Sequence, residues 1–434
     1  MKLRRGNSDQ GGVLVITIVI CALVGLMLSA YLSMVSSQHN FTQHSQIWNN
    51  VIPMCESGVE EAMSHINHIN TSSNFAINGW TKAGVVFRKT RYLNGGRCDM
   101  EIDDGMPPII TVRGYLKEPI GNDDVSRAIR VRTKMNQRFP AAVLTRGLIN
   151  LGGSGRIDSF NSTNSAESTL GRYDPLKATD RAIVGTTLRT PGCVAVGNMQ
   201  IYGSVATGPG GTVTLGPNGG VGSKAFNSIP ANRGKIEAGH WLNDANYFIP
   251  PATFPNDFGP IQPLGGGMYP PVLGGTNYKY ILYDGDYRTA SISLGNGERM
   301  LVLGRARIHV TGPTQVSAPN AYVLIAPDAS VEWYAGSSVT FGGGGTLNSG
   351  GYAINFSIIA LTAAPVGYSG SATFVGTIYA PLSAVTVTGT SDAVGAICSA
   401  SFTLSGTMGI HFDEALRGSP KQRFLASSWT ELKL

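Results

Sequence analysis

Residues 13–35 read VLVITIVICALVGLMLSAYLSMV, a run of 23 residues without a charged side chain. A helix of this length, rising 1.5 Å per residue, crosses the ~30 Å hydrocarbon core of a bilayer. Lys2, Arg4 and Arg5 precede the run, and the fifteen residues after it contain no Lys, Arg, Asp or Glu. Under the positive-inside rule, the N-terminus is cytoplasmic and the bulk of the chain is periplasmic or extracellular. We therefore expect a single-pass protein of the cell (inner) membrane.

A cleaved secretory signal peptide is the alternative interpretation of this run. The run is long for a signal peptide, and it does not end in a small-x-small cleavage site. We therefore favour a retained transmembrane helix at 13–35, preceded by a cytoplasmic basic leader at 1–12.

An apolar stripe continues the helix beyond the run. Its members recur at spacings of 4, 3, 4, 4, 3 and 3, which places them on one helical face: Trp48, Ile52, Cys55, Val59, Met63, Ile66 and Ile69. The stripe predicts an amphipathic helix over 36–70, kinked at Pro53.

Residues 80–138 form a small β module in this interpretation. Alternating apolar and polar residues at 85–87, 98–102, 109–115 and 128–133 predict an antiparallel sheet of about four strands that packs on the amphipathic helix. The basic residues of this segment alternate with Val and Ile. That pattern is typical of a solvated strand face, so we expect no nucleic-acid partner.

The remainder of the chain is rich in glycine and poor in charge. Glycine accounts for 56 of 434 residues and charged residues for 14%, against ~25% in typical soluble chains. This composition excludes a helical bundle over the whole length, because glycine destabilises helices. Short β-branched runs ending in Gly recur every ~17–24 residues across 139–416, which favours a parallel β-helix-like domain. An antiparallel β-sandwich is the alternative.

The predicted fold is therefore α+β followed by all-β. A Pro-rich loop at 250–275 interrupts the large domain, and residues 417–434 are a C-terminal tail.

Motifs for metal, cofactor or nucleophilic chemistry are weak. Residues 219–224, GGVGSK, depart from the phosphate-loop spacing and sit among predicted strands without a following helix. His65 and His68 lie one turn apart but have no evident Cys or carboxylate partner, so solvated histidines are the better interpretation. Cys98, Cys193 and Cys398 can supply at most one disulfide, while Cys21 and Cys55 read as core residues. We expect no metal and no cofactor.

A polysaccharide-degrading enzyme is the alternative that a β-helix raises, since glycoside chemistry needs two or three carboxylates on one face. The candidates are Asp158, Asp174, Asp180, Asp284, Asp286 and Asp392. They do not recur at coil spacing, and we expect a protein that is not an enzyme. Several aromatic residues lie near the Pro-rich loop. A polysaccharide-binding surface and simple packing of the loop explain them equally well: Trp241, Tyr247, Tyr269, Tyr278 and Tyr280.

The N-terminal segment resembles that of type IV pilin-like proteins. The basic leader, Gly11-Gly12 and the VLVIT of residues 13–17 are similar to PilX-type minor pilins and to the pseudopilin K of type II secretion. Residues 55–62, CESGVEEA, resemble the AEAGIEEA segment of that group. The resemblance covers residues 1–70 and implies that a prepilin peptidase cuts after Gly12, leaving Val13 as the first mature residue.

Segments of the large domain also resemble PilX-type proteins. They are GRIDSFNS at 155–162, FVGTIYAP at 374–381 and IHFDEAL at 410–416. This likeness implies a non-catalytic minor or tip subunit in pilus assembly, secretion or surface attachment. The expected partners are membrane lipid, other pilin-like or assembly proteins, and a surface polysaccharide.

Thr17 departs from the pattern of most pilins, which have glutamate at the fifth mature position. That carboxylate neutralises the N-terminal ammonium of a neighbouring subunit inside a filament core of low dielectric constant. Its absence disfavours an ordinary repeating subunit and fits a tip subunit or a solitary membrane-anchored relative.

Overall fold

The computed structural model describes residues 10–67, 78–93, 95–105, 107–118, 124–136, 138–269, 275–418 and 423–433. The chain divides into two compact units, which we describe separately. Unit 1 comprises residues 1–136 and 422–434, and unit 2 comprises residues 137–421. Each unit has its own hydrophobic core.

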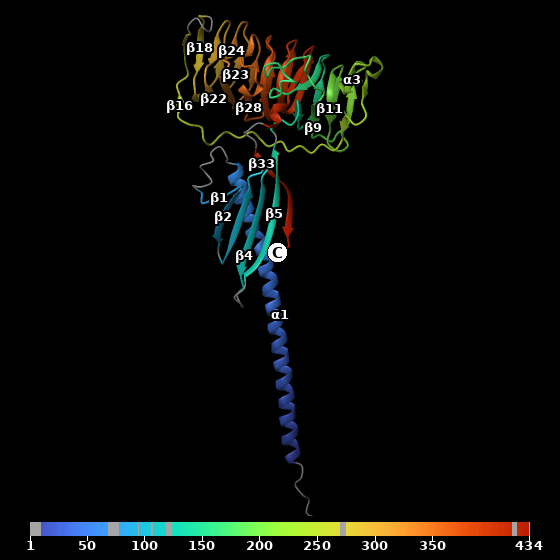
Figure 1. The fold of residues 1–434 in the computed structure, drawn as a ribbon, viewed down its shortest axis with the longest axis vertical. Helices are drawn as coiled ribbons and strands as arrows, with labels where there is room; N and C mark the ends of the chain where they lie inside the picture. The colour runs from blue at the N-terminus through green and yellow to red at the C-terminus, as the bar shows by residue number, and fades with distance from the viewer. Residues whose placement is uncertain are drawn as a thin grey trace, which may run out of the picture. The chain divides into compact units, whose positions relative to one another are not determined.

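Unit 1 begins with α1 (Gln10–Asn67), a continuous helix of 58 residues that runs through Pro53 (Figure 1). Its first half is exposed on all sides. Its second half buries one face, made up of Val51, Met54, Cys55, Val59, Ala62 and Ile66. This face is rotated from the predicted stripe, because Trp48 is 43% exposed while Ile52 and Met63 are only partly buried. Ile69 and His68 lie outside the described residues.

A six-stranded antiparallel sheet packs against this buried face. Its order is β1 (Thr81–Ala83), β2 (Val86–Leu93), β3 (Gly96–Asp103), β4 (Ile109–Lys117), β5 (Asp124–Asn136) and β33 (Arg423–Leu432). The four predicted strands correspond to β2–β5. The prediction of a C-terminal tail was wrong, because Arg423–Leu432 pairs with residues 128–136 of β5 and adds Phe424 to the core.

Unit 2 is inserted in the chain between β5 and β33. Its first part contains β6 (Val143–Thr145), β7 (Ile149–Leu151), β8 (Arg156–Phe160), β9 (Ala182–Thr186), β10 (Val194–Gly197), β11 (Gln200–Ala206), β12 (Val213–Leu215), β13 (Gly220–Gly222), the short helices α3 (Lys224–Asn227) and η1 (Pro230–Asn232), β14 (Lys235–Ile236) and β15 (Trp241–Leu242).

The second part of unit 2 returns through a longer series. It contains β16 (Ile261–Gln262), β17 (Gly265–Met268), β18 (Asn277–Leu282), β19 (Gly285–Thr289), β20 (Ile292–Ser293), β21 (Arg299–Val302), β22 (Arg305–Val310), β23 (Thr314–Val316), β24 (Tyr322–Ile325), β25 (Ser330–Ala335), β26 (Val339–Phe341), β27 (Gly345–Asn348), η3 (Ala353–Asn355), β28 (Phe356–Ala360), β29 (Val366–Tyr368), β30 (Phe374–Gly389), β31 (Ala393–Gly406), β32 (Ile410–Asp413) and η4 (Glu414–Gly418).

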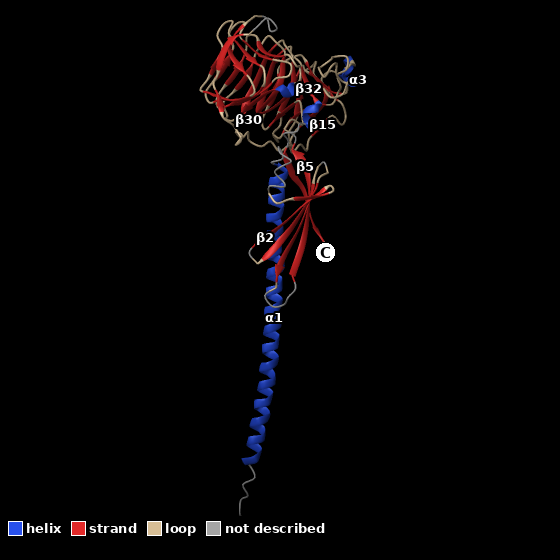
Figure 2. Cartoon of the chain, turned by 60° about the vertical axis from the view of Figure 1, so that its left-hand side comes forward, coloured by secondary structure: helices blue, strands red, loops and turns tan. Residues whose placement is uncertain are grey.

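Most of these strands belong to one large sheet of parallel strands (Figure 2). Successive strands stack in register, as in the series Ile308, Trp333, Ile358 and Ile378, whose side chains are buried. Antiparallel hairpins of the kind found in a β-sandwich do not describe these pairs. A smaller sheet, β17-β18-β21-β24-β27, is parallel except for the β17–β18 pair.

The chain enters unit 2 in the middle of the stack and leaves it there. It first winds outward to β15, then crosses to β16 at the other end and winds back to β31 and β32. These last strands pair with β6, β7 and β8. The centre of the stack is therefore a seam between the first and the last strands of the unit, which we call the central seam.

The Pro-rich loop predicted at 250–275 is irregular at 250–260, where it runs along one side of unit 2, but β16 and β17 lie in its second half. The yellow-green chain in Figure 1 runs from the end that carries α3 to the end that carries β16. Pro250 accepts a hydrogen bond from Tyr379 at 2.7 Å, and Asp257 accepts one from Arg307 at 2.9 Å. The ring of Phe254 packs on His309 at 4.4 Å between centroids. The predicted residues 270–274 lie outside the described structure.

Candidate functional sites

The predicted processing site lies at the start of α1. Gly12, Val13 and Thr17 are all exposed helical residues, and Thr17 Oγ1 donates a hydrogen bond to the carbonyl of Val13 at 2.7 Å. From Gly12 onward, α1 is long and apolar enough to cross a membrane, with a mean hydropathy of 2.9 in its most apolar window.

The CESGVEEA segment holds α1 against the sheet of unit 1. A Cβ at Gly58 would lie 2.7 Å from Val112 Cγ1, so this position needs the close approach that glycine allows. Glu61 bridges Lys89 at 2.6 Å and Arg91 at 2.7 Å. Burial alone would raise the pKa of Glu61, but the hydrogen bonds from the two cations outweigh it and lower that pKa. The segment therefore has a packing role.

Two of the sequence segments that resemble PilX-type proteins meet at the central seam. Strand β8 carries Asp158 and strand β32 carries His411, and the two residues face each other in register. His411 Nδ1 lies 2.6 Å from Asp158 Oδ1, and both side chains are almost fully buried, at 2% and 1% exposure. On the other side of the ring, His411 Nε2 lies 3.3 Å from Asp392 Oδ2. The pair joins strands that are 253 residues apart in the chain.

Two further side chains complete this cluster. Tyr173 donates its hydroxyl proton to Asp158 Oδ2 at 2.8 Å and stacks on the His411 ring at 3.7 Å between centroids. Arg156 donates to the Tyr173 hydroxyl oxygen at 2.8 Å and lies 3.1 Å from Asp158 Oδ2. The sequence analysis identified both segments by their resemblance, but it did not predict that they pair or that Tyr173 contacts them.

Burial and pairing oppose each other at His411. Burial would lower the pKa of the imidazole, but the hydrogen bond to Asp158 and the ion-pair contact with Asp392 outweigh it and raise the pKa. The same contact with His411 lowers the pKa of Asp392. The cluster is thus best described as a buried ion network that links strands β8 and β32 at the central seam.

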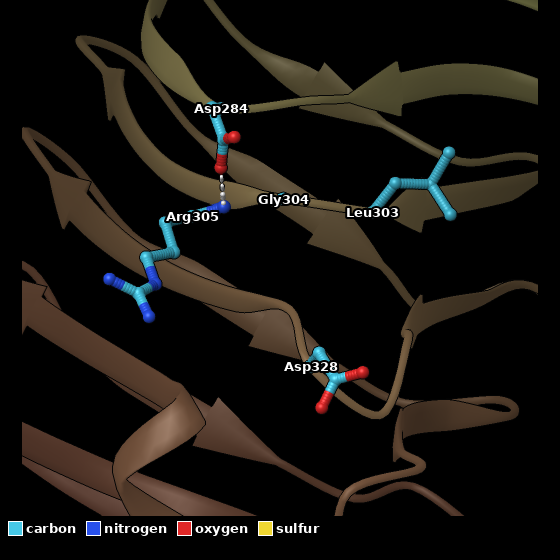
Figure 3. Close-up of a pocket in the computed structure, with 5 residues that line it drawn as sticks. All are labelled: Asp284, Leu303, Gly304, Arg305 and Asp328. Carbon is cyan, nitrogen blue, oxygen red and sulfur yellow. Dashed lines mark hydrogen bonds between the residues drawn. The ribbon is translucent and has the colours of Figure 1, made fainter.

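The other predicted carboxylates stay apart and have separate structural partners. Asp174 accepts a hydrogen bond from Thr169, and Asp180 accepts one from the Lys224 backbone. Asp286 accepts hydrogen bonds from Nε and Nη2 of Arg307, each at 2.6 Å. Asp284 lines an open pocket of about 610 Å³ with Arg305 and Asp328. In Figure 3, Asp284 accepts a hydrogen bond from the Arg305 backbone, while Asp328 lies on another turn. No pair of acids among these residues converges on one point.

The remaining motifs also have structural roles. Contrary to expectation, a short helix, α3, begins at Lys224, but Lys224 Nζ donates a hydrogen bond to the carbonyl of Ala178. His65 contacts the Glu61 carbonyl at 2.8 Å and the Trp80 ring. Across the described residues, no group of three or more His, Cys, Asp or Glu side chains is arranged for a metal ion. All five cysteines are free thiols.

The aromatic residues expected to cluster do not come together. Trp241 lies in β15 at one end of unit 2, whereas Tyr278 and Tyr280 lie in β18 toward the other end. Tyr278 is 2% exposed, and Tyr247 packs partly buried against the core. These residues form no common binding surface.

Comparisons with known proteins give little beyond this geometry. A family model described as a domain of unknown function (DUF7305) matches residues 275–419, about a third of the chain. No curated protein matches the sequence. The crystal structure of the competence-associated pilin ComZ from Thermus thermophilus is similar at 10% identity, covering 89% of this chain and 97% of that chain with a TM-score of 0.23. A score this low carries no functional argument.

Proposed function

We propose that this chain is a non-catalytic, membrane-anchored pilin-like protein of the cell envelope. The observation that carries the proposal is the division of α1 into two halves. The second half packs against a small antiparallel sheet and shares its hydrophobic core. The first half exposes a continuous apolar surface, on which Leu26 is 69% exposed and Met27 is 71% exposed. Such a surface is costly in water and calls for lipid or apolar helices around it.

Carbonate extraction and protease protection test the anchor and its orientation. We expect the full chain to stay in the membrane fraction, and protease added to spheroplasts to digest the residues after the apolar run. Release by carbonate, or full protection in spheroplasts, would contradict the proposal. The N-terminal residue of the membrane-purified protein tests cleavage after Gly12.

Within this class, Thr17 supports a minor or tip subunit in pilus assembly, secretion or surface attachment. Its hydroxyl donates to the carbonyl of its own helix and cannot neutralise a buried ammonium at Val13. An uncompensated buried charge costs several kcal/mol. The protein should therefore not polymerise alone, and Thr17→Glu should leave its function unchanged or impaired. Labelled protein along the whole length of purified filaments, at a stoichiometry like that of the major subunit, would overturn the tip role.

Surface attachment is supported by an uncharged face of unit 2, which we interpret as a β-helix. Nine strands, none of which contains a charged residue or histidine, pair in register along this face. Each contributes one outward residue to a continuous row: Ser293, Gln315, Thr340, Gly367, Thr386, Thr403, Asn150, Ala195 and Thr214. The rungs are ~4.8 Å apart. Because desolvating a charge is expensive, a face without charges favours a neutral hydroxyl-bearing polysaccharide.

Binding to insoluble neutral polysaccharides such as cellulose and chitin tests this attachment. The full chain in detergent should sediment with one of them, and Thr386→Lys together with Thr403→Lys should abolish sedimentation. Ser428→Lys, on an exposed strand position of unit 1, is the matched control. Release of sugars that Asp158→Ala or Asp284→Ala abolishes would instead favour the degrading-enzyme alternative.

A further inference from the structure

A second pocket lies in unit 1, where α1 passes the end of β4. Its cavity volume is about 570 Å³, and it is lined by one face of α1 from Ser33 to Ile47 and by Glu118, directly after β4. Ser33, Ser37, Asn40 and His44 recur at spacings of 4, 3 and 4, so one helical face supplies the polar lining.

Apart from Phe41 and Ile47, the described lining residues are polar, and few of them are charged. His44 Nδ1 lies 2.6 Å from Glu118 Oε1, and none of the described residues that line the pocket is a Lys or Arg. Among the interactions of the described residues, none uses the side chains of Ser33, Ser36, Ser37 or Asn40. The pocket therefore offers free hydroxyl and amide groups on its α1 side and one carboxylate on its sheet side.

The position of the pocket along α1 matches the surface of a membrane. The apolar run 13–35 ends within the pocket's lining, and the pocket continues for about four turns beyond Ser33. Tyr31, Phe41 and Trp48 are exposed by 63%, 81% and 43% along the same stretch. Exposed aromatic residues flanking an apolar run are typical of the interface between hydrocarbon and water.

We propose that this pocket binds the phosphoethanolamine headgroup of a membrane phospholipid, an inference that rests on the proposed membrane anchor. Ser36, Ser37 and Asn40 donate hydrogen bonds to the phosphate oxygens, and the ammonium donates to Glu118. The order along the helix fits, because the serines lie about two turns, and Asn40 about one turn, closer to the hydrocarbon than the His44–Glu118 level, as the phosphate lies deeper than the amine.

The charges of the pocket select this headgroup over the common alternatives. A phosphoglycerol headgroup carries a net negative charge, which would meet Glu118 with no Lys or Arg among the described lining residues to offset the repulsion. A phosphocholine headgroup has the same net charge as phosphoethanolamine but has no N–H to donate to the carboxylate.

Native mass spectrometry of the detergent-solubilised full chain tests the inference. The protein is first incubated in vesicles of phosphatidylcholine alone, or with a fifth of either phosphatidylethanolamine or phosphatidylglycerol. We expect at least fivefold preferential retention of phosphatidylethanolamine and its loss in Glu118→Gln. Asn40→Leu, which keeps a helical residue, should also abolish retention. Equal retention of all three lipids, preference for phosphatidylglycerol, or undiminished retention in both variants would overturn it.

Two controls separate this inference from the anchor. Glu101→Gln removes an exposed acid that pairs with Arg88 on the same sheet, outside the pocket, and should retain the lipid like the unmodified chain. Carbonate extraction is run on every variant. Release of the unmodified chain would refute the anchor itself, whereas a firmly inserted chain without headgroup preference would refute the pocket alone.

Discussion

At the scale of single residues, His411 links β32, near the end of the unit 2 sequence, to β8, near its start. Its imidazole is buried between Asp158, on β8 near the start of the unit's sequence, and Asp392, directly before β31 near its end. His411→Ala removes a donor from the buried Asp158, and breaking a buried pair in this way costs about 3 kcal/mol. Thermal unfolding of the full chain should show the loss. Asp392→Asn, which changes a half-exposed partner, should cost less than about 1 kcal/mol.

The same residue gives unit 2 a pH-dependent stability. The pKa of His411 is raised in the folded protein, so its stabilising contribution is complete below the ordinary histidine pKa of ~6.5 and is lost as the pH rises through the folded pKa. The pKa of Asp392 is lowered, so its contribution disappears as the pH falls below ~4. Arg156 and Tyr173 face the cluster and stay protonated in this range.

We therefore expect the difference in unfolding temperature between the unmodified chain and His411→Gln to be largest at about pH 4 to 6.5 and to shrink above it. Differential scanning fluorimetry across pH 4 to 9 measures this difference, which removes the pH dependence of groups that both chains share. A difference that is constant over the whole range would show that His411 does not titrate with folding.

At the scale of elements, the sequence predicts helices and strands whose signal lies within the element, but it does not predict pairing between segments that are far apart in the chain. Hydropathy and helical spacing predicted most of α1, and alternation predicted β2–β5, because both signals lie within one element. Strand β33 was missed because most of its side chains are exposed and its partner β5 is about 290 residues away. The pairing of Asp158 with His411 was missed for the same reason, since its register is set by the return path of the chain.

Strand β33 should be essential for unit 1 despite its exposure. Ending the chain after residue 421 removes Phe424 from the core and leaves β5 as an unpaired edge. We expect β5 amides to lose protection in hydrogen exchange and the truncated chain to aggregate. Removing residues 433–434 alone, beyond the last paired residue Leu432, is the control and should change neither property. Unchanged protection of β5 in the longer truncation would contradict this role.

At the scale of the whole molecule, unit 2 is an insertion into a hairpin of unit 1. Asn136 at the end of β5 faces Arg423 at the start of β33, so the chain leaves and re-enters unit 1 at one pair of residues. The buried clusters of the two units share no residue, and the buried residues of α1 belong to the cluster of unit 1. The proposed anchoring and the proposed surface attachment can therefore be assigned to separate folding units.

This arrangement predicts that unit 1 folds without unit 2. Replacing residues 137–422 by a two-residue Asn-Gly turn joins a pair that already faces across an antiparallel ladder, which is the geometry a type I′ turn closes. The shortened chain should stay in the membrane after carbonate extraction and keep the buried environment of Trp80, which is 3% exposed, in near-ultraviolet circular dichroism. It should lose all binding to polysaccharide. A chain ending at residue 136, which lacks β33, is the matched control and should fail to fold because the Phe424 side of the core is missing. If the shortened chain with β33 also failed to fold, unit 1 would depend on unit 2, and the two functions would not be separable.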